Sequence, residues 1–557
     1  MTSNLFRFHG GVKPAYQKDA SVQTPITKLI PTADLAIPLQ QSIGRTPRPV
    51  VAVGDFVRKG QRIADPEGSI STGVHASTSG QVIAIEDRLL PHTSGLAAPA
   101  VVIRPDGKDE WLDRVPFAMD QASAAETRRY LQAMGVVGLG GAVFPTHAKL
   151  KSGATGHLDT LIINGAECEP YITCDDMLMR ERPAQIISGT LMMQRLLGAR
   201  RVVIGIEDNK PEAIAAMRTA APAGVEIVAV PTRYPAGGAK QLIRVLTGIE
   251  VPHGERSTDH GVQCFNVGTA YAVHDAIACG QPLISRIVTV AGNVEQPGNF
   301  DVPFGMAMSD VVALAKPLPD SDRLVMGGPM MGLRMPAFQV PVVKATNCIL
   351  VGSPALFPPP APEMPCIRCG ECAKACPADL QPFELYWFAR GRLYGKAQEY
   401  HLFDCIECGC CAYVCPSSIP LVDYYRHAKS EIWAREREKS AADEARQRHE
   451  FRQYREEREK EEKAARLAAK TAAGRERAAA ALAEVSQIEQ LPMATPEQEA
   501  KKALIAAALE RARQQRESAP PANTDDLTPE QAAEIAAIDA RRAEIREAAK
   551  AQLPDDN

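Results

Sequence analysis

The chain has 557 residues, of which 45% are hydrophobic and 5% aromatic, and its formal net charge at pH 7 is −4. One core rarely grows beyond about 250 residues, so this length predicts several domains. The small net charge, without a domain-sized basic patch, argues against nucleic-acid binding. The opening MTSNLFRFHGGVKPAYQKDA has no apolar h-region, and we find no uncharged apolar run of about 18 residues. We therefore expect neither a secretory signal nor a transmembrane helix.

The elements expected first along the chain are short strands. Residues 30–110 are rich in Val, Ile and Gly, and VAVGDFVRKGQRIADPEG followed by VHASTSGQVIAIE alternates as strands joined by glycine turns do. From 120 to 285, strand-like runs such as LIIN and RVVIGI alternate with helical stretches, which predicts an α/β domain. RIVTVAGNVEQPGNFDVPFG then predicts a second small β-containing module, and SPALFPPPAPEMP is typical of a stiff linker.

After about Tyr424 the composition changes to Ala, Glu, Lys and Arg at helical periodicity. Few large apolar residues occur there, so a long solvated helix is expected, followed by a disordered stretch with prolines at 492, 496, 520 and 521. Such a charge run is typical of a solvated tether, although contact with lipid or a partner is an alternative.

Nine of the 14 cysteines lie between Cys366 and Cys415, a crowding that favours metal or redox chemistry over disulfides. CIRCGECAKACP begins at Cys366, and CIECGCCAYVCP repeats its spacing 39 residues later. This spacing matches the bacterial ferredoxin pattern, in which three cysteines wrap one [4Fe–4S] cluster and the fourth reaches the other. We therefore assign one cluster to Cys366, Cys369, Cys372 and Cys415, and the second to Cys405, Cys408, Cys411 and Cys376.

Zinc is the alternative for these runs, but zinc sites usually show two separated pairs of ligands. Cys410 is spare and is expected to be a neutral core or surface thiol. Free buried thiols are the expectation for the scattered cysteines, Cys168, Cys174, Cys264, Cys279 and Cys348.

Two upstream segments suggest a cofactor site. In GLGGAVFPTHAK, Gly138, Gly140 and Gly141 would let backbone amides approach a phosphate or a planar ring, and Lys149 would neutralise a phosphate. An ordinary tight turn is the alternative. The turn NGAECEP, at 164–170, follows a strand and offers Asn164 together with the carboxylates of Glu167 and Glu169, which would otherwise face water.

These segments resemble the NADH-oxidising flavoprotein subunit of respiratory complex I, with its GRGGAGFPTGxKW loop and NADExEP turn. FNVGT, at 265–269, is similar to its NNVET stretch, whereas Leu139 stands in place of the arginine. The resemblance implies FMN, with NAD(H) as substrate. The residues it implies around them are Gly138, Gly140, Gly141, Phe144, Thr146, Lys149, Asn164, Asn266 and, on the nicotinamide side, Glu167 and Glu169. His147 is expected to be a surface histidine rather than a cofactor contact.

A closer resemblance is to the C subunits of the Rnf (Rsx) ion-translocating electron transport complexes. It rests on FHGGVKP, GLGGAVFPTHAKL, NGAECEPYITCDDMLM, YPAGGAKQLI, FNVGTAYAVHDAI, GGPMMG and both cysteine runs, and it covers about residues 5–430. It implies a multidomain α/β and α+β architecture. The expected parts are a barrel-sandwich module resembling biotinyl/lipoyl carriers (1–115), an FMN/NADH-binding α/β domain (116–284), a β-grasp (SLBB-like) module (285–345), a Pro-rich linker (346–364), a two-cluster ferredoxin domain (365–424) and a charged helical or disordered tail (425–557). The hairpin at 76–80 has no lysine to acylate, so the first module is expected to be structural.

The function that this resemblance implies is a translocase subunit passing electrons between NAD(H), FMN and two clusters, peripheral on the cytoplasmic side of the bacterial inner membrane. Its expected partners are the other subunits of the complex, including an iron–sulfur subunit, and ferredoxin indirectly. The carboxylates would orient cofactors, and no catalytic side chain is expected. Two alternatives stay open: a flavin-free iron–sulfur scaffold within such a complex, and a subunit of a soluble NAD-linked hydrogenase or dehydrogenase.

Overall fold

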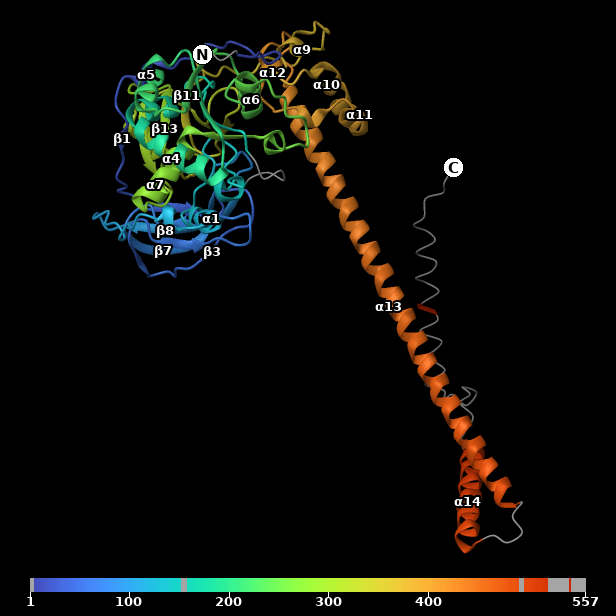
Figure 1. Ribbon diagram of the computed structural model, residues 1–557. Helices are drawn as coiled ribbons and strands as arrows, with labels where there is room; N and C mark the ends of the chain where they lie inside the picture. Colours follow the sequence, from blue (N-terminus) through green and yellow to red (C-terminus); the bar gives the residue numbers. More distant parts are fainter. Residues whose placement is uncertain (1–4, 152–157, 490–494, 519–539, 542–557) are drawn as a thin grey trace. The chain divides into compact units, whose positions relative to one another are not determined.

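The computed structural model describes residues 5–151, 158–489, 495–518 and 540–541 (Figure 1). The chain divides into two compact units, Met1–Glu436 and Arg437–Asn557. The first unit contains the sheets and the cysteine runs, and the second is helical.

The N-terminal part of the first unit consists of two small antiparallel sheets, as the alternating sequence predicts. One has the strand order β2-β8-β7-β4 and the other β3-β5-β6. Apolar residues on their inward faces are buried in one core, among them Ile37, Ile63, Val82 and Ile103. The strands are β2 (Leu35–Pro38), β3 (Arg48–Pro49), β4 (Phe56–Val57), β5 (Arg62–Asp65), β6 (Val74–His75), β7 (Gly80–Leu89) and β8 (Ala97–Pro105).

The central domain is a parallel sheet covered by helices. Its order is β11-β10-β9-β12, and its strands are almost continuously apolar because helices bury both faces. The carboxyl ends of β9 and β12 meet at one edge, which is where open α/β sheets bind ligands. The strands are β9 (Thr160–Gly165), β10 (Arg201–Glu207), β11 (Val225–Val230) and β12 (Val262–Asn266); the helices are α1 (Ala124–Ala133), α2 (Thr146–Lys149), α3 (Cys174–Glu181), α4 (Pro183–Leu197), α5 (Pro211–Ala220), α6 (Ala239–Thr247) and α7 (Val267–Cys279).

The next module is a six-stranded mixed sheet with the order β1-β14-β13-β17-β15-β16. Its central strand, β17 (Cys348–Gly352), is buried at every position and pairs with both neighbours. The expected linker 346–364 thus begins later than predicted, because CILVG is an apolar strand that completes this sheet. The other elements are β1 (Thr27–Lys28), β13 (Ser285–Gly292), β14 (Gly298–Pro303), β15 (Arg323–Met326), β16 (Leu333–Arg334) and α8 (Met308–Leu314).

The cysteine module is built of short helices, α9 (Glu371–Ala375), α10 (Pro382–Arg390), α11 (Tyr394–Glu399) and α12 (Cys410–Tyr413). Its core includes the start of α13 (Leu421–Glu489), where Tyr425, Ala428 and Ile432 are buried. The tail expected from residue 425 therefore begins inside this core.

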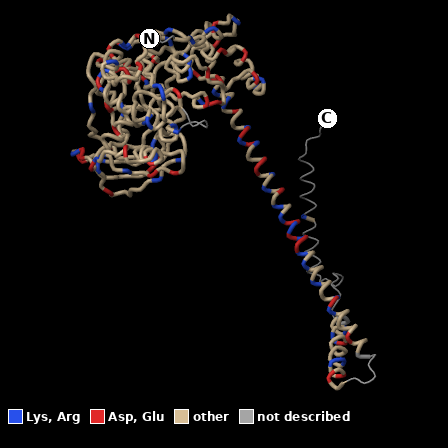
Figure 2. Tube along the Cα trace, viewed as in Figure 1, with Lys and Arg blue, Asp and Glu red and all other residues tan. Residues whose placement is uncertain are grey.

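Beyond Glu436 the second unit comprises the rest of α13 and α14 (Pro496–Ser518). Its side chains are largely exposed, and Figure 2 shows residues of both charges along it. Ion pairs four residues apart, such as Arg452–Glu456 at 3.0 Å and Arg458–Glu462 at 3.4 Å, support an isolated helix. The helical part of the expected tail is confirmed. Pro496, expected in a disordered stretch, instead starts α14, and the prolines at 492, 520 and 521 lie outside the described residues.

Within the described ranges, no helix combines the length and the apolar composition needed to cross a bilayer.

Candidate functional site

The two cysteine runs adopt the same backbone conformation. Arg368 and Glu407, each two residues after the first cysteine of its run, have φ of 55° and 57°. The glycines that follow the second cysteines, Gly370 and Gly409, have φ of 79° and 80°. Residues other than glycine seldom adopt this region, so Arg368 and Glu407 hold a conformation that their own side chains do not favour. The repeat in the sequence is thus a repeat in structure.

One cavity is lined by cysteines of both runs. Cys405, Cys408 and Cys411 come from the second run and Cys376 from the first. Tyr425 of α13 closes its apolar wall together with neighbouring leucines. Four thiols from two distant loops around one apolar cavity suit the thiolate donor set of an iron–sulfur cluster. This grouping supports the cross-ligated assignment.

Three of the remaining ligand candidates, Cys366, Cys369 and Cys372, also lie close together. Burial raises the pKa of the Cys372 thiol, and Cys369 and Cys366 add to that effect through their charge. Cys366 and Cys415 both pack against the core of the module. Cys369 is exposed, whereas Cys376, Cys408 and Cys411 are buried. The candidate cluster of Cys366, Cys369, Cys372 and Cys415 is therefore the more solvent-facing of the two.

The spare cysteine, Cys410, is fully buried next to Cys408. It is therefore a core thiol and not a surface thiol. Of the scattered cysteines, Cys279 is exposed, contrary to expectation, because it ends α7. The others are buried free thiols: Cys168, Cys174, Cys264 and Cys348.

The glycine loop lies at the carboxyl edge of the parallel sheet. The Gly138 amide donates to the Phe144 carbonyl at 2.8 Å, which closes the loop, and the Leu139 amide donates to Thr269 Oγ1 at 2.9 Å. A Cβ on Gly140 would lie 3.1 Å from Asn266 Cβ, so the loop contacts the end of β12 closely. Asn266 in turn caps α7 by accepting from the Gly268 amide at 2.8 Å.

Two observations fit an anionic, planar group at this loop. Gly141 has φ of 118°, and a Cβ there would meet no described atom within 4 Å. Thr146 Oγ1, at the start of α2, is buried without a hydrogen-bond partner among the described residues. An open backbone and an unpaired hydroxyl are features that a phosphate-bearing cofactor such as FMN would satisfy.

Unlike Gly141 and Thr146, Lys149 and His147 have side chains that contact other parts of the protein. Lys149 Nζ donates to the Cys264 carbonyl and lies 4.6 Å from the centre of the Phe265 ring, and burial lowers its pKa. His147 is buried, not at the surface as expected, with Nε2 3.1 Å from the carbonyl of Ser69 in the N-terminal module. Both side chains thus have structural contacts of their own.

In the acidic turn, Asn164 and Glu167 are used by the protein itself. Asn164 donates to the Gly237 carbonyl at 2.8 Å and accepts from the Ala166 amide at 2.9 Å. Glu167 is buried and accepts from the Asp175 amide at 2.9 Å, so it stabilises the start of α3. The alternative that this carboxylate faces water is therefore wrong.

Glu169 points toward another part of the unit. Its Oε1 accepts from the amides of Met330 and Met331 at 2.7 and 3.0 Å, in the GGPMMG segment. Burial raises the pKa of Glu169, while these amides act in the opposite direction. The side chain is thus a half-buried acceptor shared between the α/β domain and the β-grasp module.

Sequence reasoning missed three polar residues around these segments. Asp175 accepts from Asn266 Nδ2 at 2.6 Å, and burial, followed by Glu167, raises its pKa to about 7. Arg286 is buried and donates to the Leu139 carbonyl at 3.2 Å. Tyr234 donates to the Cys408 carbonyl at 2.6 Å. Asp175 and Tyr234 could have been found from the sequence, because they lie in YITCDDMLM and YPAGG, two of the segments that resemble the family.

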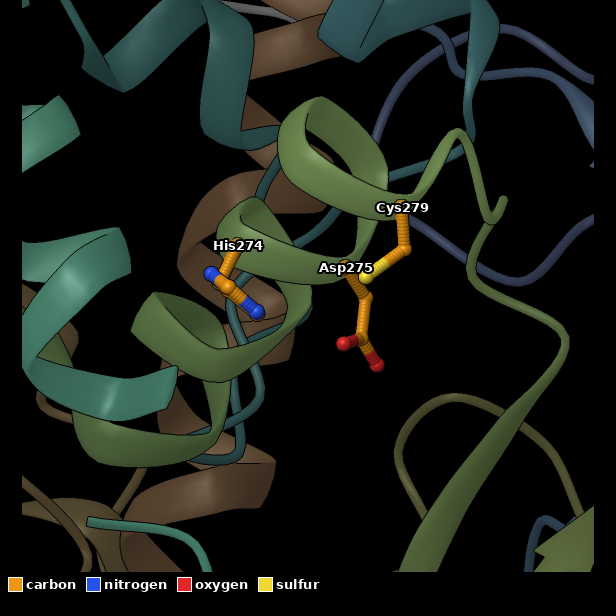
Figure 3. Close-up of side chains that lie close together, drawn as sticks. All are labelled: His274, Asp275 and Cys279. Carbon is orange, nitrogen blue, oxygen red and sulfur yellow. The ribbon is translucent and has the colours of Figure 1, made fainter. Parts of the chain in front are cut away.

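A group of potential metal ligands, His274, Asp275 and Cys279, lies on α7 with ligand atoms within 4.8 Å of one another (Figure 3). Burial raises the pKa of Asp275 to about 6, while the Tyr271 hydroxyl and the Arg182 guanidinium lower it. Because a guanidinium already compensates this carboxylate, we assign no metal to the group.

Four family models match successive parts of the chain. They are the RnfC barrel sandwich hybrid domain (6–108), the Nuo51 FMN-binding domain (131–275), the SLBB domain (287–334) and the 4Fe-4S dicluster domain (365–419). The order and the kinds of the predicted modules are confirmed. The matches likewise support FMN and iron–sulfur clusters as the cofactors.

Curated relatives extend this similarity. The C subunit of an ion-translocating oxidoreductase complex from Pseudomonas aeruginosa is 46% identical over 408 residues, which are 72% of this chain and 52% of that protein. Proteins of the same name from Serratia proteamaculans and Salmonella typhimurium are 46% and 45% identical, also over 72% of this chain, and over 57% and 55% of their own lengths. The chain belongs to the family of these C subunits. The resemblance inferred from the sequence is thereby confirmed, and the chain spans little more than half the length of these relatives.

Among solved structures, an NAD+-reducing [NiFe]-hydrogenase in the H2-reduced state aligns with a TM-score of 0.38 and 21% identity, over 58% of this chain and 64% of that one. This likeness is too weak to support a conclusion about fold or function.

Proposed function

We propose that this chain is the electron-transferring subunit of an ion-translocating oxidoreductase complex and passes electrons between NAD(H), FMN and two [4Fe–4S] clusters. The observation that carries the proposal is the cavity lined by Cys376, Cys405, Cys408 and Cys411. It unites ligands of both cysteine runs, and its loops contact a domain matched by an FMN-binding model. A flavin site beside an iron–sulfur site is the arrangement that couples a two-electron carrier to one-electron carriers.

In this proposal the glycine loop and its neighbours hold the flavin. The backbone at Gly140 and Gly141, the Thr146 hydroxyl and Asn266 would contact it. When bound, FMN would exchange hydride with NAD(H) and single electrons with the clusters. The protein orients the cofactors: Glu167 holds the start of α3 at this edge, and no side-chain nucleophile or general base takes part.

The cellular setting is part of the same proposal. The name of the relatives places them in a complex, so the expected partners are its other subunits, including an iron–sulfur subunit that receives or supplies electrons. Ferredoxin would exchange electrons with the chain indirectly. The site of action would be the cytoplasmic face of the bacterial inner membrane, with the chain bound peripherally.

One observation favours the alternative of a flavin-free scaffold. Lys149, which was expected to neutralise a phosphate, instead donates to the Cys264 carbonyl and lies over Phe265. In such a scaffold the clusters alone would conduct, and the flavoprotein fold would serve only to dock them.

A single preparation separates the two functions. The chain is purified under anaerobic conditions, its iron and released flavin are counted, and NADH is added while the cluster absorbance is followed. About eight irons, one FMN and rapid bleaching by NADH are expected for two [4Fe–4S] clusters fed by a flavin. About eight irons without flavin, and no response to NADH, would establish the scaffold instead.

A further inference from the structure

The loops that carry Cys376, Cys405, Cys408 and Cys411 are contacted by segments outside the cysteine module. The N-terminal segment around FHGG contributes the first contacts. His9 Nδ1 lies 2.8 Å from the Cys376 carbonyl, and the Gly11 amide donates to the Ala375 carbonyl at 2.9 Å. A Cβ on Gly10 would lie 2.5 Å from the Cys376 carbonyl oxygen, so the two backbones are in close contact.

Tyr234, which follows β11 in the α/β domain, contributes the second contact. It is 1% exposed, and its hydroxyl donates to the Cys408 carbonyl at 2.6 Å. Its own backbone pairs with Val12 through hydrogen bonds of 2.8 and 3.0 Å. The backbone of Tyr234 is therefore held by the N-terminal segment, and its hydroxyl is held by the cysteine loop.

Glu169 contributes the third contact, through the GGPMMG segment. Its Oε1 accepts the amides of Met330 and Met331, and a Cβ on Gly328 would lie 2.2 Å from Glu169 Cγ. The Met330 carbonyl oxygen then lies 3.0 Å from the position of a Cβ on Gly409, beside Cys408. A half-buried carboxylate of the flavin-side turn is thus separated from the cysteine loop by one tight turn of backbone.

The carboxylate of Glu169 lies close to the cysteine loop, because the Met330 amide donates to it and the Met330 carbonyl contacts Gly409. Inside a protein the effective dielectric constant is far below that of water, so a buried charge acts strongly on nearby redox centres. A negative charge opposes the addition of an electron, and hydrogen bonding around the ligands and solvent exposure also set cluster potentials.

We propose that Glu169 and Tyr234 are positioning residues that set the reduction potential of the cluster held by Cys376, Cys405, Cys408 and Cys411, and that this cluster is the one facing the flavoprotein core. The inference rests on the proposed function, since it requires that both clusters assemble. Glu169 lowers the potential through its charge, and Tyr234 holds the Cys408 backbone in place. The cluster of Cys366, Cys369, Cys372 and Cys415, with Cys369 exposed, lacks these contacts among the described residues.

The test is a redox titration of the full chain, assembled with its clusters and reduced with dithionite, followed by electron paramagnetic resonance. We call the cluster of Cys376, Cys405, Cys408 and Cys411 the inner cluster and the other one the outer cluster. Replacing Cys405 with Ser should abolish the signal of the inner cluster and thereby identify it. In Glu169→Gln that signal should titrate at a higher potential, by about a tenfold change in the reduction equilibrium, or 59 mV for one electron. The other signal should not move. Glu371→Gln, an exposed carboxylate beside Cys372, is the matched control and should move neither by as much.

Tyr234→Phe provides an independent variant if Glu169→Gln does not assemble its clusters. It keeps the ring and removes the hydrogen bond to Cys408, so the inner signal should shift or broaden while the outer one stays. Tyr413→Phe, an exposed tyrosine in the same module, is its control. Unchanged potentials in both variants with full iron content, or equal shifts of both clusters, would overturn the inference. Dithionite reduces clusters without flavin, so this outcome is distinct from a wild-type chain that lacks iron or does not respond to NADH.

Discussion

The hydroxyl of Tyr234 donates a 2.6 Å hydrogen bond to the backbone carbonyl of Cys408, although 174 residues separate the two. This bond joins the loop after β11 to the second cysteine run, so the cysteine module is not an independent ferredoxin attached by a flexible linker. Tyr425, near the start of α13, lines the cavity that Cys408 also lines, and donates to the Pro382 carbonyl at 2.6 Å. The candidate cluster site is therefore lined by residues of the cysteine module and α13 and is contacted by a residue of the α/β domain.

Cross-ligation makes a direct prediction about single cysteines. Replacing Cys376 with Ser should abolish the same cluster signal as replacing Cys405, and Cys366→Ser should abolish the other signal. Each variant should retain about four of eight irons, because each [4Fe–4S] cluster needs its own set of thiolates. Iron analysis with electron paramagnetic resonance measures this. If Cys376→Ser instead removed the signal that Cys366→Ser removes, each run would hold its own cluster and the assignment would be incorrect.

The unpaired hydroxyl of Thr146 predicts a separation of flavin binding from stability. Thr146→Val replaces a buried hydroxyl without a described partner by a methyl group of similar size, so the free energy of unfolding should not fall. Flavin affinity should fall by roughly tenfold, which corresponds to one lost hydrogen bond of about 1.4 kcal/mol. Fluorescence titration with FMN and thermal unfolding measure the two effects.

Thr269→Val is the matched control for that experiment. Thr269 Oγ1 accepts from the Leu139 amide at 2.9 Å and is buried, so its loss should lower the free energy of unfolding by about 1–3 kcal/mol. Equal flavin affinity in Thr146→Val and the wild type would show that this hydroxyl does not contact the cofactor.

The sequence predicted what is local and repeated, and missed what depends on tertiary contact. The spacing of the cysteine runs determines which thiols can share a loop, so their grouping around one cavity could be expected. Glu169 was expected beside a nicotinamide, but its partners, Met330 and Met331, lie 161 and 162 residues away. Likewise, β17 continues an apolar run into a proline-rich stretch, and only its pairing with β13 and β15 shows it to be a central strand.

The half-buried carboxyl of Asp175 predicts a pH-dependent stability. Burial, followed by Glu167, raises its pKa from 3.8 to about 7, so between these values the folded chain keeps a proton that the unfolded chain has released. The folded state then binds more protons, and its stability falls as the pH rises through this window.

Asp175→Asn is neutral at every pH and should remove that loss. At pH 8 we expect its Tm to exceed that of the wild type by about 2–4 °C, corresponding to about 1 kcal/mol, and at pH 4 the two should agree. Asp87→Asn, at an exposed position, should leave the pH dependence as it is in the wild type. A wild-type Tm that rises between pH 4 and pH 7, with the same slope in Asp175→Asn, would contradict the assigned direction of the shift.

The equivalent glycines of the two loops, Gly370 and Gly409, predict unequal effects of one substitution. Both have φ near 80°, so alanine at either position is strained by about 1–2 kcal/mol. A Cβ on Gly370 meets no described atom within 4 Å, whereas one on Gly409 would lie 3.0 Å from the Met330 carbonyl oxygen. Gly409→Ala should therefore also push the second loop away from the β-grasp module. Its cluster should be lost faster to an iron chelator than the corresponding cluster in Gly370→Ala, as followed by visible absorbance. Equal rates in the two variants would mean that Met330 does not constrain the loop, and that backbone strain alone sets the stability of both sites.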